Sequence, residues 1–267
     1  MATLPALHHS TAFCTRSTPA TVRSQLTALL HQAHDHRALN HPYLQALAMG
    51  NVPNLRWAIA DFARQYYGYS THFPAFLKAA IGRLECPDHR AALLENLEEE
   101  SGHYSDEDLA VLAGVGIQAD WIIGVPHPRL FRRFQRAMGI GDADLQETEM
   151  PVILWRDHLL EILNDGSAAE AIGALGLGTE SIVSECYQFI RQALAHLDDL
   201  DPRDTVFFPL HTLVDDAHQE TLLEVATDLA VASGSVQDLE RGMVGALELR
   251  AEFWDWMYDR ALTQGSL

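Results

Sequence analysis

Lysine is nearly missing from this chain of 267 residues: Lys78 is the only one, and Lys and Arg together number 18 against 37 acidic residues. The formal net charge is −19 at pH 7. A surface with this excess of negative charge repels the phosphates of nucleic acids and of anionic membranes. We therefore expect neither of them as a partner.

Cysteine is scarce as well, and Cys14, Cys86 and Cys186 are scattered without a CxxC pair. This argues against a disulfide framework and favours a reducing compartment. No apolar run approaches the roughly 18 residues that a membrane span needs. The first residues lack the basic and then apolar pattern of a secretory signal. We expect a cytoplasmic protein.

Alternating strand patterns of useful length are also missing, whereas helical periodicity recurs from residue 21 onwards. We predict an all-α fold: a single domain over residues 21–267, a bundle of about seven main helices, after a flexible tail at 1–20. The expected helices are 21–36, 54–84 (one or two, with a break at Pro74), 87–114, 127–138, 151–164, 168–175, 179–197, 208–232 and one that ends near residue 262.

The most informative motif present is His211, Asp215 and His218. Offsets of four and three residues place these side chains within roughly a 60° arc of one helix face, since each residue turns about 100°. Leu222 falls in the same arc, so this face is expected to point inward. Burying such groups is costly unless a partner compensates, and a divalent transition metal is the simplest one.

Two glutamates share apolar helix faces. Glu180 precedes Val183 and Tyr187 on one face, although a glutamate in a first turn also suits the helix dipole. Glu100 shares a face with Leu93, Leu97, Tyr104 and Glu107, and with His103 it forms Glu-x-x-His, a pair used in helical-bundle metal sites. A surface salt-bridging role is the alternative for this pair.

His127 begins the segment HPRLFRRFQRAMGI, with Phe131 and Phe134 on its face. A lone His before Pro is also typical of a helix cap or a core histidine. The four arginines of this segment lie off that face, and we interpret them as a solvated surface rather than a clamp for a substrate carboxylate; they are Arg129, Arg132, Arg133 and Arg136. Core packing is preferred to pocket lining as the role of five aromatic residues: Tyr66, Tyr67, Tyr69, Phe73 and Phe76. Five further histidines are interpreted as surface or packing residues: His31, His34, His36, His41 and His72.

Four segments together resemble one family, the heme-oxygenase-like diiron oxygenases and oxidases. They are ENLEEESG at 95–102, HPRLFRRFQRAMGI at 127–140, ALGLGTESIV at 174–183 and HTLVDDAHQ at 211–219. They cover most of residues 90–220, and the last two are the most specific. The resemblance implies a heme-oxygenase-like helical fold.

The same resemblance implies the iron ligands Glu100, His127, Glu180, His211, Asp215 and His218. The five other than His127 are also the residues to which it assigns catalysis. This chain departs from the family pattern by an apparent insertion between Glu100 and His127, so His103 stays open as the alternative to His127. If His127 is the ligand, His103 or Glu107 is a candidate for an outer or extra ligand.

The activity implied by the resemblance is that of a non-heme diiron enzyme, with two Fe(II)/Fe(III) ions as cofactor and O2 as co-substrate. The expected substrate is a small amino-acid- or amine-derived metabolite in natural-product biosynthesis. N-oxygenation, C–H oxidation or desaturation, and C–C cleavage are the reactions that this family offers. An external electron donor and a homodimer are the partners that the resemblance allows.

Several alternatives belong to other classes. Oxidative decarboxylation of a medium-chain fatty acid to a terminal alkene is the second candidate, and a metal-free cofactor-assembly relative of the same fold is the third. A ferritin-like iron store would need two Glu-x-x-His motifs, whereas only Glu100–His103 is present. A purely structural helical adaptor does not explain three separate inward-facing polar clusters.

Overall fold

The computed structural model describes residues 19–145 and 148–263, except for the side chains of residues 213–218. All regular structure in these ranges is helical, so the all-α prediction is confirmed. Residues 1–18 of the expected tail lie outside the described part. The helices are α1 (Pro19–Asp35), α2 (Pro42–Ala48), α3 (Leu55–Ser70), α4 (Phe73–Arg83), α5 (Pro87–Glu100), α6 (Asp106–Gly114), α7 (Ala119–Ile122), α8 (His127–Ala137), the 3-10 turn η1 (Ala143–Leu145), α9 (Met150–Asp165), α10 (Ala168–Ile172), the π-helical segment η2 (Gly173–Glu180), α11 (Ser181–Leu194), α12 (Phe207–Ser233) and α13 (Gln237–Thr263).

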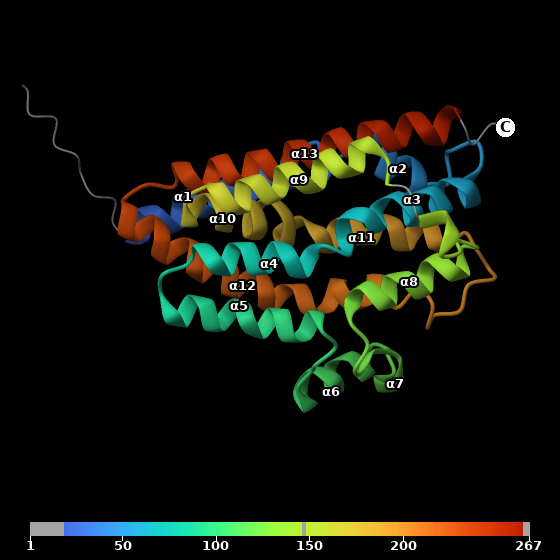
Figure 1. The fold of residues 1–267 in the computed structure, drawn as a ribbon, viewed down its shortest axis with the longest axis horizontal. Helices are drawn as coiled ribbons and strands as arrows, with labels where there is room; N and C mark the ends of the chain where they lie inside the picture. The colour runs from blue at the N-terminus through green and yellow to red at the C-terminus, as the bar shows by residue number, and fades with distance from the viewer. Residues whose placement is uncertain (1–18, 146–147, 264–267) are drawn as a thin grey trace, which may run out of the picture.

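The helices form an elongated bundle in which the two longest, α12 and α13, run along the long axis (Figure 1). Helix α9 packs along α13, and α5 packs on α4 and α12. The short helices α6 and α7 project from one side of the bundle, beyond α5 and α8 (Figure 1). In the described residues no helix combines the length and the apolar composition that crossing a membrane requires.

The expected continuous helix over 87–114 is wrong, because the chain breaks after Glu100. Gly102 adopts φ +88°, a left-handed conformation that favours glycine. Ser105 then caps α6: its hydroxyl accepts from the backbone N–H of Asp108, whose carboxylate accepts from the N–H of Ser105. This capping box starts a second helix in a new direction.

The two helices expected at 168–175 and 179–197 are instead joined by η2, a π-helical segment. Small residues let it approach α13 closely: a Cβ on Gly173 would lie 2.1 Å from the carbonyl oxygen of Leu239, and one on Gly178 would lie 2.7 Å from that of Met243. π-Helical turns are rare and are frequently found at functional sites. Glu180 is the last residue of this segment.

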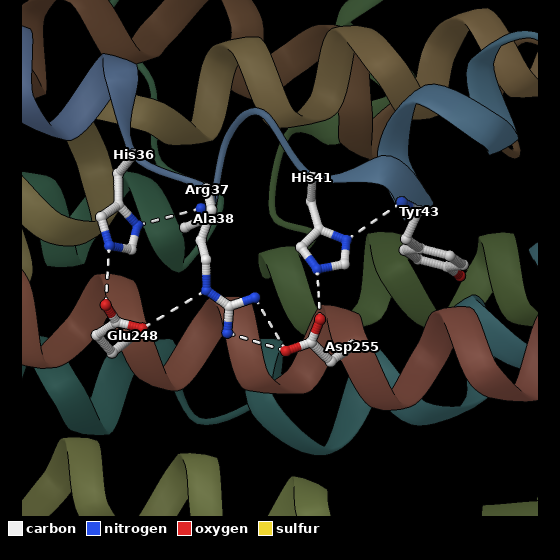
Figure 2. A network of polar contacts seen from close by, with 7 residues as sticks. All are labelled: His36, Arg37, Ala38, His41, Tyr43, Glu248 and Asp255. Atoms are coloured by element: carbon white, nitrogen blue, oxygen red, sulfur yellow. Dashed lines mark hydrogen bonds and ion pairs between the residues drawn. The ribbon is translucent and has the colours of Figure 1, made fainter.

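The loop between α1 and α2 is fixed to α13 by a polar network (Figure 2). His36 lies 3.2 Å from Glu248, while Arg37 donates two hydrogen bonds to Asp255 and His41 lies 3.0 Å from the same carboxylate. The interpretation of His36 and His41 as surface or packing residues is therefore incomplete. Their acidic partners come from a helix more than 200 residues away, where helical spacing offers no signal.

Candidate metal centre

Glu100 is placed by the end of α5 and the loop that follows. A Cβ on Gly102 would lie 2.6 Å from the backbone nitrogen of Val125, and the N–H of Gly124 donates to the carbonyl of Gly102. This close backbone contact holds the start of α8 against the end of α5. Glu100 and His127, 27 residues apart, are both buried as a result, with 5% and 4% of their surface exposed.

His127 is contacted at both ring nitrogens. Its Nδ1 lies 2.9 Å from Oε1 of Glu100, and its Nε2 lies 2.8 Å from the hydroxyl of Tyr104. Burial, followed by the charges of Glu100 and Glu99, raises the pKa of Tyr104 well above its usual value. Tyr104 is therefore a neutral phenol at neutral pH, able to donate to or accept from the imidazole.

His211 reaches the same point from α12. Its Nδ1 lies 2.6 Å from the carbonyl oxygen of Phe207, one turn earlier in α12. Its Nε2 lies 3.9 Å from Oε1 of Glu100. An imidazole that donates one N–H to a backbone carbonyl presents its other nitrogen as an acceptor. This is the usual arrangement of a metal-bound histidine.

Glu100, His127 and His211 each offer one atom of a candidate metal site, and these atoms all lie within 4.8 Å of one another. A carboxylate and two imidazoles form a ligand set typical of non-heme iron and also acceptable to zinc. The residues thus fit a transition metal by their chemistry as well as by their convergence.

The three residues line a cavity of about 30 Å³, room for about two or three water molecules. Glu180, only 5% exposed, lines the same cavity from the end of η2. Most of the remaining wall is aromatic or aliphatic. The other lining residues are Tyr66, Tyr69, Ser70, Phe73, Thr179, Val183, Tyr187, Phe207 and Arg250.

Other residues singled out in the sequence lie elsewhere. His103 is exposed, with Nδ1 3.3 Å from the carbonyl of Glu98, and Glu107 is exposed on α6. Neither of them is part of the group formed by Glu100, His127 and His211. Asp215 and His218 belong to α12, but their side chains lie outside the described residues.

The interpretation of the α8 arginines as a solvated surface is wrong for Arg132, which is buried and bonded to Asp142 and Gln135. The chain after α8 folds back over this face and supplies Asp142. Arg133 is half-buried and donates to the carbonyl of Trp121. Core packing is likewise only part of the role of the tyrosine cluster, because Tyr66, Tyr69 and Phe73 also line the cavity.

Arg250 and Ser70 are cavity residues that the sequence analysis did not single out. The sequence did contain a signal for Arg250. At helical spacing it shares one face with four apolar residues: Met243, Leu247, Trp254 and Met257. An arginine in the middle of such a face is unusual. Ser70 carried no comparable signal.

A family model described as iron-containing redox enzyme matches residues 60–251. The 4-aminobenzoate synthase of Chlamydia muridarum is 22% identical over 207 residues, which cover 75% of this chain and 77% of that protein.

Two solved structures are similar over nearly their full length. A CADD-like protein of unknown function from Nostoc punctiforme has a TM-score of 0.70 at 17% identity, covering 92% of this chain and 99% of that one. A domain of unknown function from Shewanella denitrificans, with a heme oxygenase-like fold, has a TM-score of 0.66 at 14% identity and covers 91% and 93%. The heme-oxygenase-like fold implied by the sequence resemblance is thereby confirmed.

Proposed function

Because the chain belongs to the family of iron-containing redox enzymes, we propose that it is a non-heme diiron enzyme that uses O2 to oxidise or oxygenate a small amino-acid- or amine-derived metabolite. The observation that carries this proposal is the convergence of Glu100, His127 and His211 within 4.8 Å at the wall of one cavity. Glu180 on the same wall supports a second metal position.

The proposed ligand set is Glu100, His127, Glu180 and His211, together with Asp215 and His218 of α12. His127 is preferred to His103 because His127 is buried beside Glu100, whereas His103 is exposed. Bound iron would supply the redox chemistry with O2 that protein side chains lack. The chain's own residues hold the metal, orient its ligands and exclude water.

Two of these protein roles follow from the contacts. The carbonyl of Phe207 fixes the ring of His211, and the hydroxyl of Tyr104 fixes that of His127. Phe73, Val183 and Phe207 form an apolar part of the cavity wall, which would limit the access of water to a bound metal. A dry site strengthens electrostatic interactions and limits side reactions of the oxidant with water.

The name of the chlamydial relative supports an amine-bearing substrate or product, because 4-aminobenzoate is a small aromatic amine. A space of about 30 Å³ must widen for either candidate, the amine-bearing metabolite or the medium-chain fatty acid.

The test is anaerobic loading with iron(II), measurement of bound iron, and rapid mixing with O2 under stopped-flow absorbance. We expect about two irons per chain, as a six-ligand set implies, and a transient visible band. His211→Ala and Glu180→Ala should lose iron and the band but keep most helix content.

His127→Ala and His103→Ala form a matched pair for the uncertain ligand. We expect the first to lose iron and the second to behave as the wild type. The reverse result would reassign the ligand to His103. An unmodified chain that takes up no iron would contradict the proposed function and favour the metal-free relatives.

A further inference from the structure

Arg250 is a cation buried in the middle of the bundle. Its side chain is 1% exposed, and its guanidinium donates to the hydroxyl of Tyr69 at 3.2 Å and to that of Tyr66 at 3.5 Å. The guanidinium carbon also lies 5.3 Å from the ring centre of Trp155 and 5.5 Å from that of Tyr69. Aromatic rings thus surround a permanent positive charge.

No carboxylate among the described side chains lies within ion-pair distance of Arg250. Its tyrosine neighbours do not supply a negative charge, because burial raises the pKa of Tyr66 and of Tyr69. The buried Arg132 and the half-buried Arg260 differ in this respect, since Arg132 pairs with Asp142 and Arg260 with Asp61. A buried charge without a counter-charge is costly unless a ligand supplies it.

Two polar groups on the cavity wall also lack hydrogen-bond partners among the described residues. They are Nε of Arg250 and the hydroxyl oxygen of Ser70, both buried, and both residues line the cavity that Glu100, His127 and His211 share. Unsatisfied buried donors of this kind are rare in folded proteins. A guanidinium and a hydroxyl that line the same cavity are complementary to the two oxygens of a carboxylate.

We propose that the substrate is a carboxylic acid whose carboxylate binds Arg250 and Ser70, while its apolar body extends past Val183 and Phe207 towards Glu100, His127 and His211. The proposal names the class of substrate for the cavity described above. The reaction of that substrate rests on the proposed function. The carboxylate is held by residues of α3 and α13 that are not proposed metal ligands, so the reacting part of the molecule is its other end.

The test measures binding to the metal-free protein by calorimetry, so that no carboxylate can bind through iron. The probes are benzoate and hexanoate, each compared with its neutral amide, benzamide or hexanamide. We expect each carboxylate to bind at least tenfold more tightly than its amide, because only the carboxylate is a counter-charge for Arg250. Equal binding of acid and amide, or no binding of either acid, would overturn the proposal.

Arg250→Gln should weaken benzoate binding at least tenfold. Ser70→Ala should weaken it severalfold while leaving the buried cation in place. Arg241→Gln is the control, because Arg241 is an exposed arginine of the same helix and its loss changes the net charge equally. If Arg250→Gln does not fold, Ser70→Ala decides: unchanged benzoate affinity in that variant would refute the assigned site.

Iron uptake, measured separately, distinguishes the two proposals. A protein that binds benzoate through Arg250 but takes up no iron has the carboxylate site without the proposed redox function. One that takes up iron but does not distinguish benzoate from benzamide keeps the redox function and loses this site.

Discussion

The hydroxyl of Tyr104 contacts the ring of His127 on the side opposite Glu100. It lies 2.8 Å from Nε2, while Nδ1 faces Glu100. A residue that fixes the orientation of a metal-binding imidazole contributes to metal affinity without touching the metal. Tyr104 is therefore a positioning residue in the proposed site.

Replacing Tyr104 by Phe removes this contact and leaves a buried ring nitrogen without a partner. We expect the affinity for iron(II) to fall about tenfold or more, as for other outer partners of metal ligands. Competition with a coloured chelator measures it. Tyr67→Phe is the control, because Tyr67 stacks on Phe131 and does not line the cavity of the proposed metal site. Equal affinities in the two variants would contradict the role of Tyr104.

Single residues of the site differed in how far the sequence alone could place them. Glu100 and Glu180 were singled out because each shares an apolar helix face, and His211 because its spacing to Asp215 and His218 places three polar groups on one face. The choice between His103 and His127 depended on the turn at Gly102, whose contact with Val125 is not visible in a local pattern. Arg250 was passed over because an arginine in an amphipathic helix usually extends its charge to solvent.

At the scale of elements, the contact of α10 and η2 with α13 determines where Glu180 and Arg250 lie. Its closest point is Gly242, where a Cβ would lie 1.9 Å from the carbonyl oxygen of Glu170. Periodicity predicted both partners as helices but not the π-helical turn between 173 and 180, because that turn results from packing against α13.

Gly242→Ala should therefore destabilise the protein by about 1–3 kcal/mol, the usual cost of overpacking. Urea unfolding followed by circular dichroism measures the change. Gly82→Ala is a matched control, because Gly82 is an exposed glycine of α4 with no atom within 4 Å of the added Cβ. It should stabilise the protein by about 0.5–1 kcal/mol. Similar effects of both substitutions would contradict the close packing.

At the scale of the whole molecule, the network of Figure 2 makes stability depend on pH. The hydrogen bond from Arg37 holds the pKa of Asp255 below its ordinary value of 3.8. Burial lowers the pKa of His41 from 6.5, more than the nearby Asp255 raises it. Both groups bind protons less readily in the folded state, so their contribution is complete above about pH 6.5 and is lost as the pH falls through their folded pKa values.

Asp255→Asn should lower the free energy of unfolding at pH 7, and it should reduce the loss of stability between pH 7 and pH 3. Urea titrations at several pH values measure both effects. Asp259→Asn is the control on the same helix, since among the described residues no ion pair involves Asp259. The network would not be the origin of the acid sensitivity if Asp255→Asn retained the full pH dependence of the wild type.

The same network joins positions 212 to 218 residues apart. Contacts between distant positions require a long loop to close, which slows folding relative to bundles built from neighbouring helices. During synthesis, α1 and α2 leave the ribosome long before Glu248 and Asp255 exist. The polar contacts of the loop between α1 and α2 with α13 can therefore form only after Asp255 has been synthesised.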